Sequence, residues 1–313
     1  MSERLRDNPD ELDALVGVTA DALGMPAVYV EKDFWVTEVL RAASEERSIA
    51  LTDGSLAPVK FTFKGGTSLS RVFGIVERFS EDVDLLAEFP ADTSLTARHK
   101  VLKLVDQSVR DHLSLPGDRV TVGSSTTGVK RYTTYAYPTA TTETSLKEGV
   151  LLELGSRGGT HPSAAHSYRS LVAEHAITVI GEAETAWEEF APFDVNVLAP
   201  ERTLFEELAA VHDAASRNDT TALLNSVATS TTSIAYSRTR KWSRYLKQRT
   251  RPGNSSLSMI LTSRAPPQDS LRPAAPQMDM PPARHSTQST SDVPPSKPDT
   301  TPHSNLFTES ASH

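Results

Sequence analysis

The sequence predicts an α/β fold, in which a mixed β-sheet carries helices, followed from about residue 200 by the start of a truncated helical part. Two observations support this class. Short apolar segments with strand-like alternation are interleaved with segments whose apolar residues recur at helical spacing. The clearest change of period lies in residues 61–86, where a strand, a glycine-rich turn, a short helix and a second strand are predicted in succession.

Two helices are expected before this stretch, over residues 9–23 and 27–43. The second helix carries apolar residues that we expect to pack against the sheet, namely Phe34, Val39 and Leu40. It also carries the charged run Glu31, Lys32 and Asp33. Because charge runs usually form a solvated helix face, that is the expectation here, and a functional site is the alternative.

The central stretch places two carboxylates on one face of a strand. Residues 61–64 are apolar and aromatic, and Gly65 and Gly66 interrupt them. Asp82 and Asp84 alternate with apolar residues, so their side chains share a face. Mg²⁺ prefers oxygen ligands, commonly one or two carboxylates together with substrate phosphates. The pair is therefore a candidate metal site.

The turn before the carboxylates suits a phosphate group. Gly65 and Gly66 allow close backbone approach to a ligand, and the hydroxyls of Thr67 and Ser68 can donate to phosphate oxygens. A phosphate-binding turn followed by a carboxylate pair is typical of sites for metal-assisted phosphoryl or nucleotidyl transfer. The alternative is a structural turn followed by a surface strand with two solvated aspartates.

Later segments complete the predicted sheet and its helices. The expected elements are helices over 93–113 and from Pro200, and strands over 120–122, 132–137, 149–155, 176–180 and 193–198. In the second of these strands, Tyr132, Tyr135 and Tyr137 are expected to be half-buried packing residues. The neighbouring Lys130 and Arg131 keep open the alternative of a base-stacking surface.

Glu153 is a lone carboxylate inside an apolar strand. Such a group must face solvent or have a partner. On a strand next to Asp82 and Asp84 it would be a third carboxylate, and the alternative is an outward-facing glutamate on an edge strand. Arg157 follows in a loop near the same sheet edge, where it could meet a triphosphate or an RNA backbone.

At this point a family resemblance can be stated. Phe-Lys-Gly-Gly-Thr-Ser-Leu-Ser from Phe63, followed by Arg-Phe-Ser-Glu-Asp-Val-Asp-Leu from Arg78, resembles the AbiEii/AbiGii toxin nucleotidyltransferases. These belong to the DNA polymerase β superfamily, are the toxin half of type IV toxin–antitoxin systems and include MenT-like toxins. Glu-Lys-Asp-x-Trp at residues 31–35 is also similar to the family. The resemblance implies a polymerase-β-like nucleotidyltransferase sheet flanked by helices.

The resemblance further implies Mg²⁺-dependent transfer of NMP from an NTP to RNA, with the tRNA 3′ acceptor end as the expected target. Asp82, Asp84 and Glu153 would hold two metal ions, and Glu153 would help to activate the attacking hydroxyl. The implied nucleotide-binding residues are Lys64, Gly65, Gly66, Thr67, Ser68 and Ser80. The implied protein partner is a winged-helix antitoxin. A metal-dependent nuclease is disfavoured, because the residue two after Glu153 is not lysine.

One family position departs from its pattern. The helix from Pro200 reads Thr-Leu-Phe-Glu-Glu-Leu, where the family usually reads Thr-Leu-x-Glu-Lys-Leu with a phosphate-binding lysine. Glu207 stands in place of that lysine. This reversal of charge favours the second functional hypothesis, a degenerate relative that is catalytically inactive and only binds nucleotide or antitoxin.

The composition changes near Asn225. The predicted division is a nucleotidyltransferase domain over 1–199, the start of a helical domain over 200–224, and a disordered Ser/Thr/Pro-rich tail over 225–313. The tail holds 11 of the 32 Lys/Arg and 5 of the 40 Asp/Glu residues, a balance of +6, so the body has a balance of −14 and the whole chain −8. An acidic body predicts that RNA would need a local basic patch.

The genetic code suggests an origin for the tail. Residues 227–236 can be encoded so that reading from the third base gives Arg-His-Phe-Tyr-Asp-Ile, which resembles the family's next helix and its active-site aspartate. We hypothesise a frameshift near residue 225. Sequencing the gene there tests it, because no single insertion or deletion would restore the helix if the hypothesis is wrong.

The cysteine content and the length of the apolar runs indicate the cellular compartment. The chain has no cysteine, which excludes disulfides and Cys-ligated zinc and is typical of a reducing cytosol. No apolar run reaches the roughly 20 residues of a membrane span, and the first residues lack the apolar core of a signal peptide. A soluble, cytoplasmic protein without a membrane partner is therefore expected.

Overall fold

The computed structural model describes residues 3–51, 53–76, 79–139 and 146–221, with the side chains of residues 207 and 210 left out. Within these ranges an eight-stranded sheet has the order β4-β5-β6-β3-β2-β8-β7, and β1 pairs with β2 beside this path. The strands are β1 (Arg47–Ala50), β2 (Leu56–Lys64), β3 (Asp82–Glu88), β4 (Val120–Thr126), β5 (Lys130–Tyr135), β6 (Val150–Gly155), β7 (Ser163–Tyr168) and β8 (Phe193–Leu198).

The sheet is mixed, as the sequence predicts. Strands β3 and β6 are parallel, as are β2 and β8, and the other pairs are antiparallel. The longer helices are α1 (Pro9–Leu23), α2 (Ala27–Ser44), α4 (Leu95–His112) and α6 (Pro200–Ser216). The shorter ones are η1 (Leu5–Asp7), α3 (Gly65–Thr67), η2 (Ser68–Val72), η3 (Gly117–Arg119), α5 (Leu171–His175), η4 (Ala176–Ile180) and η5 (Glu188–Phe190).

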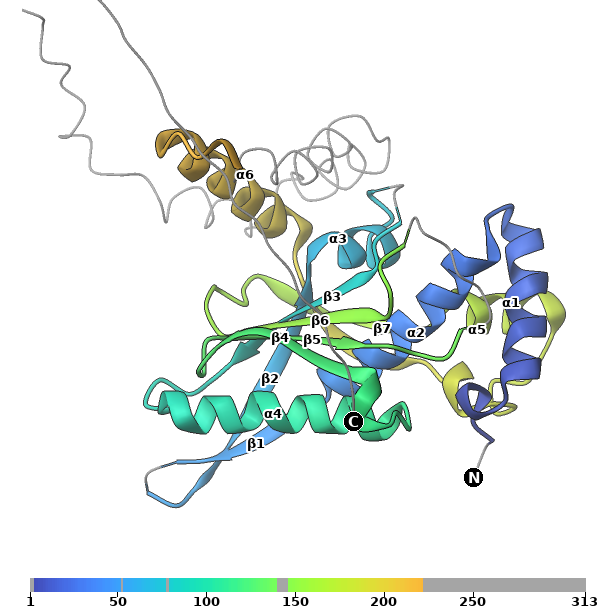
Figure 1. The fold of residues 1–313 in the computed structure, drawn as a ribbon, viewed down its shortest axis with the longest axis horizontal. Helices are drawn as coiled ribbons and strands as arrows, with labels where there is room; N and C mark the ends of the chain where they lie inside the picture. Colours follow the sequence, from blue (N-terminus) through green and yellow to red (C-terminus); the bar gives the residue numbers. More distant parts are fainter. Residues whose placement is uncertain (1–2, 52, 77–78, 140–145, 222–313) are drawn as a thin grey trace, which may run out of the picture. The chain divides into compact units, whose positions relative to one another are not determined.

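The helices leave one part of the sheet free for a site. In Figure 1, α4 runs along one side of the sheet and α3 lies on the other. Side chains along the central strands alternate between the two faces of the sheet. Phe63, Val83 and Leu85 are buried in the core, whereas Lys64 and Asp84 point to the opposite face. The core therefore fixes the strands that carry the polar residues.

Helix α2 is the central core helix. Phe34, Val39 and Leu40 are fully buried, which confirms the expected packing against the sheet. The expectation of a solvated face for the charged run on the same helix is wrong. Glu31, Lys32 and Asp33 are all at most 4% exposed. The physical reason is that each has a polar partner: Thr139, Glu81 and Arg71, respectively.

The strand predicted over residues 176–180 is also wrong. This segment continues α5 as a π-helix, although its β-branched residues predict a strand. The Ser170 side chain accepts a hydrogen bond from the Ala173 N–H at 3.1 Å and so caps a helix at the preceding turn. Val172, Ala173 and Ala176 are buried at helical spacing, so this packing outweighs the local strand propensity.

The remaining boundaries differ by less. The short helix predicted after the glycine turn ends at Val72. Strands β1 and β7 were not expected from the sequence. The strand predicted over 132–137 is β5, which ends at Tyr135. The tail from residue 225 lies outside the described residues, and the predicted domain boundaries stay predictions.

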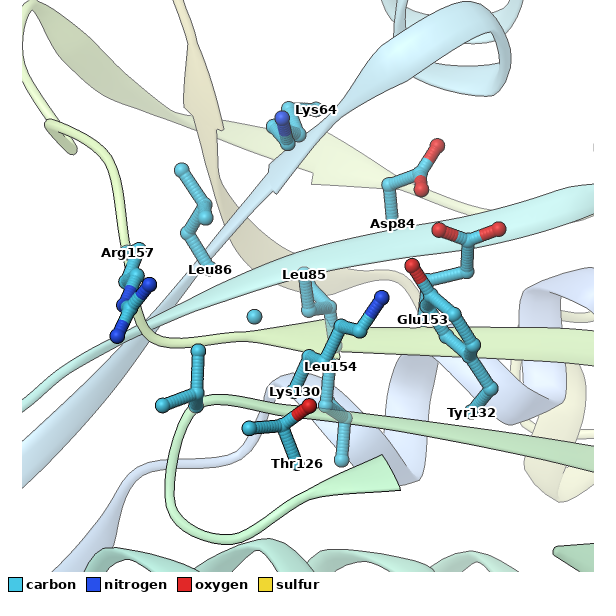
Figure 2. Close-up of a pocket in the computed structure, with 12 residues that line it drawn as sticks. Lys64, Asp84, Leu85, Leu86, Thr126, Lys130, Tyr132, Glu153, Leu154 and Arg157 are labelled. Carbon is cyan, nitrogen blue, oxygen red and sulfur yellow. The ribbon is translucent and has the colours of Figure 1, made fainter. Parts of the chain in front are cut away.

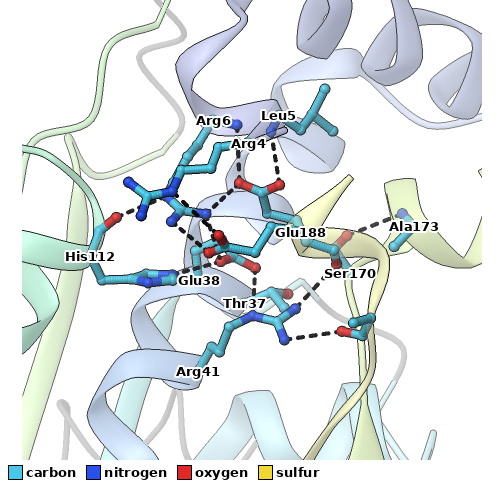
Figure 3. Close-up of polar contacts among 12 residues, drawn as sticks. Arg4, Leu5, Arg6, Thr37, Glu38, Arg41, His112, Ser170, Ala173 and Glu188 are labelled. Carbon is cyan, nitrogen blue, oxygen red and sulfur yellow. Dashed lines mark hydrogen bonds and ion pairs between the residues drawn. The ribbon is translucent and has the colours of Figure 1, made fainter. Parts of the chain in front are cut away.

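A buried charge network joins the N-terminal segment to the core (Figure 3). Arg6 pairs with Glu188 at 2.7 Å, and Glu189 accepts from the Leu5 N–H at 2.8 Å. Glu38 of α2 lies 2.8 Å from His112 Nε2 at the end of α4. Because each carboxylate has several donors, the network tolerates burial and fixes α2 relative to α4.

Among the described helices, no single one is long and apolar enough to cross a membrane. Helices α1 and α2 pass such a test only when taken together, across a bend of 118°.

Candidate active site

Four side chains form a row across four adjacent strands. The strand registers pair Tyr132 with Glu153, Glu153 with Asp84, and Asp84 with Lys64. Residues in register on neighbouring strands share a face of the sheet. Figure 2 shows the Asp84 and Glu153 carboxyl groups side by side on β3 and β6. Glu153 is thus not on an edge strand but directly beside the aspartate-bearing strand.

Asp82 lies two residues before Asp84 on the same face of β3. Its Oδ2 accepts from Lys147 Nζ at 2.9 Å. Its other oxygen, Oδ1, is buried and has no hydrogen-bond partner among the described residues. A buried carboxylate oxygen without a donor is costly, and a cation is one partner that would satisfy it.

Gly65 brings the backbone against Asp84. Its φ is +80°, and a Cβ at this position would lie 2.1 Å from Asp84 Oδ2. Only glycine avoids both the strained conformation and this overlap. The turn and the carboxylate are therefore in contact, as expected for a ligand that touches both. Gly66 is the next residue and lies within α3.

Burial and mutual repulsion shift the carboxyl groups. Burial, followed by the nearby Glu153, raises the pKa of Asp84 from 3.8 to about 7, with Lys64 opposing the change. Burial and the Asp82 charge likewise raise the pKa of Glu153. The hydrogen bond to Asp82 raises the pKa of Lys147 and keeps it charged. Burial and mutual repulsion therefore both oppose ionisation of Asp84 and Glu153.

The hydroxyl residues of the turn are bound internally. Thr67 Oγ1 donates to the Asp82 carbonyl oxygen at 2.6 Å and lies 2.9 Å from Ser80 Oγ. Ser68 Oγ donates to the Gly65 carbonyl oxygen at 2.8 Å. Thr67 and Ser68 are buried, whereas Ser80 is partly exposed. In this conformation they shape the turn and link it to β3.

Helix α6 reaches the site through Glu206. Its carboxylate lies 3.3 Å from Lys64 Nζ and 2.9 Å from Arg202 Nε, one turn earlier on the helix. Because Lys64 is shared between Asp84 and Glu206, it is only partly available to an anion. The Glu207 side chain lies outside the described residues.

A pocket of about 440 Å³ opens beside the row (Figure 2). Asp84 and Glu153 line it together with three cations, Lys64, Lys130 and Arg157. The Lys130 ammonium lies over the Tyr132 ring, 5.1 Å from its centre.

The other tyrosines of that segment, Tyr135 and Tyr137, are buried. Of the tyrosine cluster, only Tyr132 therefore faces the pocket, and the packing interpretation holds for the other two.

Sequence reasoning missed Lys147, Glu81 and the inward role of Lys32. Glu81 directly precedes the aspartate pair, and Lys147 lies three residues before β6, so both flank elements that the sequence identifies. Proximity to these strand ends was the available signal. It was weak, since a lysine and a glutamate at strand ends are normally solvated.

Three carboxylates at the row are candidate ligands for a divalent metal. In the described part of the chain, no three His, Cys, Asp or Glu side chains already stand in a metal-coordinating arrangement. The chemistry nonetheless fits, because Asp82, Asp84 and Glu153 are hard oxygen donors on adjacent strands, and Asp82 Oδ1 is buried and unpaired. Asp82, Asp84 and Glu153 are therefore candidate ligands for a divalent metal.

Comparison with known protein families gives a match that includes the site. A family model for the nucleotidyl transferase AbiEii toxin of type IV toxin–antitoxin systems matches residues 50–224. The chain belongs to the AbiEii toxin family. The AbiEii match covers every strand from β2 onward and α6, and therefore the whole row of site residues. No curated protein is similar enough to the chain to count as a match.

Family membership makes this chain a toxin-type nucleotidyltransferase of a type IV toxin–antitoxin system. It implies an NTP substrate, a divalent metal and an antitoxin partner. The AbiEii match ends at residue 224, directly before the position where the composition changes.

Proposed function

We propose that the chain is a Mg²⁺-dependent nucleotidyltransferase that adds NMP from an NTP to an RNA 3′ end, with the tRNA acceptor end as the target. The observation that carries this proposal is the register of Asp84 with Glu153, beside Asp82 and against Gly65. It places three carboxylates next to a turn that permits close backbone approach, which suits a metal-bound triphosphate.

The transfer is an in-line displacement at the α-phosphorus. The RNA 3′ oxygen forms a new bond to this phosphorus, the bond to the β-phosphate oxygen breaks, and pyrophosphate leaves. Asp82, Asp84 and Glu153 would hold Mg²⁺, which supplies charge neutralisation at the phosphates when bound. Glu153, whose pKa is raised by burial, is suited to accept the proton of the attacking hydroxyl.

The pocket beside Glu153 supports RNA as the acceptor. Lys130 and Arg157 supply positive charge there, although the body of the protein is acidic. Tyr132 offers a half-buried ring on which a terminal base can stack. The nucleotide-binding turn is proposed to comprise Lys64, Gly65, Gly66, Thr67, Ser68 and Ser80. The proposed antitoxin is a winged-helix protein encoded next to this gene.

The test is transfer of label from each α-³²P-labelled NTP to total tRNA. Label on full-length tRNA supports the proposal, and Asp82→Asn in parallel shows that it depends on the site. Shortened RNA would indicate a nuclease instead. Absence of label combined with tight NTP binding would favour the second candidate, an inactive relative that only binds nucleotide or antitoxin. The observation favouring that candidate is the Glu206 carboxylate on Lys64, with Glu207 at the lysine position of the family.

A further inference from the structure

The backbone of Lys147 is held by two side chains that also pair with each other. Its N–H donates to Glu81 Oε2 at 3.0 Å, and its carbonyl oxygen accepts from Lys32 Nζ at 2.6 Å. Lys32 Nζ lies 3.2 Å from Glu81 Oε2. Because Glu81 directly precedes β3, this arrangement fixes the main chain at Lys147 next to the strand that carries the aspartate pair.

Lys32 acts in the interior and not on a ligand. It is fully buried on α2, and its ammonium also donates to the Gly149 carbonyl oxygen. An ammonium has three donors, and these three contacts use all of them. Burial lowers the pKa of Lys32, while Glu81 favours its charged form. Lys32 is therefore a positioning residue for the segment that leads into β6.

The Lys147 side chain differs from its backbone. It is 63% exposed, and its ammonium contacts Asp82 Oδ2 at 2.9 Å. Exposed ion pairs of this kind are weak, so the side chain can leave Asp82 at small cost. The Lys147 ammonium can therefore change position while the Lys147 backbone stays fixed beside the carboxylates of the site.

Of the other cations near the row, two already have contacts, and Arg157 is one that the proposed function assigns to the RNA. Lys64 pairs with Glu206 at 3.3 Å, and Lys130 lies over the Tyr132 ring. Position 207 carries a glutamate. A triphosphate is strongly anionic and needs a cation besides the metal.

We propose that Lys147 binds the phosphate oxygens of the NTP, and that its contact with Asp82 is the resting position of the same ammonium. This inference rests on the proposed function and names a residue for it. A divalent ion held by the Asp82 carboxylate would repel the Lys147 ammonium and weaken its contact with Oδ2. Lys147 therefore gives up that oxygen when the metal site is filled, and its ammonium turns to the triphosphate while Lys32 and Glu81 hold its backbone.

The test compares Lys147→Gln with Lys103→Gln, a matched control on the exposed face of α4. Mn²⁺ affinity is measured without nucleotide by electron paramagnetic resonance. The affinities of the four NTPs and of inorganic tripolyphosphate are measured by calorimetry in saturating Mg²⁺, without RNA. Lys147→Gln should tighten Mn²⁺ binding about threefold, by removing a competing exposed cation. It should weaken NTP and tripolyphosphate binding about tenfold, and Lys147→Arg should restore most of it. Lys103→Gln should change neither.

Either affinity unchanged in Lys147→Gln overturns the inference, as does a loss that Lys147→Arg does not repair. Asp82→Asn separates this from failure of the proposed function. If Asp82→Asn abolishes Mn²⁺ binding while Lys147→Gln has no effect, only the role of Lys147 is wrong. If Asp82→Asn leaves Mn²⁺ and NTP binding intact, the proposed active site is itself wrong.

Discussion

Asp84 on β3 lies directly beside Glu153 on β6, in register across a parallel strand pair. The two carboxyl groups come from segments almost seventy positions apart, and neither has a salt-bridge partner of its own in the described part of the chain. Burying two like charges together is unfavourable, and the raised pKa of about 7 for Asp84 is the consequence. Removing one of the two charges should therefore change the pH dependence of stability.

Asp82→Asn should abolish transfer and Mn²⁺ binding while the fold stays intact. The substitution preserves shape but removes a ligand charge, and we expect transfer to fall at least about a hundredfold when it is made in an otherwise active chain, such as Glu207→Lys with the alternative reading frame. Stability should change by less than about 1 kcal/mol, because the Lys147 partner of the lost ion pair is 63% exposed. Labelling assays and denaturation curves measure both. Full activity in the variant would show that Asp82 does not bind the metal.

Asp84→Asn should stabilise the metal-free protein at high pH. The unfolded carboxyl ionises near pH 3.8 and the folded one near pH 7. Between these values the folded state binds more protons, so wild-type stability falls as the pH rises from about 4 to about 7 and then levels off. Removing the charge should therefore add about 1–3 kcal/mol at pH 8 and almost nothing at pH 4.

Urea denaturation in EDTA at both pH values measures this difference. Glu88→Gln on the same strand is the matched control, because Glu88 lies at the far end of β3 and is exposed. An equal effect of Asp84→Asn at both pH values would contradict the buried-charge explanation.

The two glycines of the turn should respond differently. Gly65→Ala should destabilise the fold by about 1–3 kcal/mol, because its φ is positive and its Cβ would overlap Asp84 Oδ2. Gly66→Val should leave a folded protein with weaker NTP binding, because its methyl groups would obstruct backbone approach to the phosphates. Thermal melts and calorimetry with NTP distinguish the two. Unchanged NTP affinity in a folded Gly66→Val protein would mean that the turn is only structural.

The proposed transfer to RNA should be weak or absent in the chain as written, because Glu207 and the present tail depart from the family pattern. A charge reversal at position 207 would replace attraction of a triphosphate by repulsion, with an upper figure of roughly 4 kcal/mol at about 4 Å and an effective dielectric near 20. Glu207→Lys alone should recover little transfer. Glu207→Lys combined with the alternative reading frame after residue 225 should recover RNA labelling and growth inhibition. Strong labelling by the unmodified chain would contradict this. The phosphate cation would then come from Lys64, Lys130 or Arg157, or from Lys147 as inferred above.

The sequence by itself determined the class of fold and the central motif. Period-two alternation at Asp82 and Asp84 requires a shared strand face, and Gly65 is explained by a backbone position that excludes a Cβ. These are local rules, in which covalent geometry decides the outcome. The strands at residues 61–64, 149–155 and 193–198 and the long helices were predictable for the same reason.

Only the tertiary structure decided which residues meet. The register of β3 with β6 places Glu153 beside Asp84, and nothing local to either strand specifies that pairing. Packing turned residues 176–180 into helix, because a capped turn and buried neighbours outweighed β-branched propensity. Lys32 illustrates the same limit: a charge on a helix predicts solvent, and only the carboxylate and carbonyl oxygens brought to it by the sheet make its burial favourable.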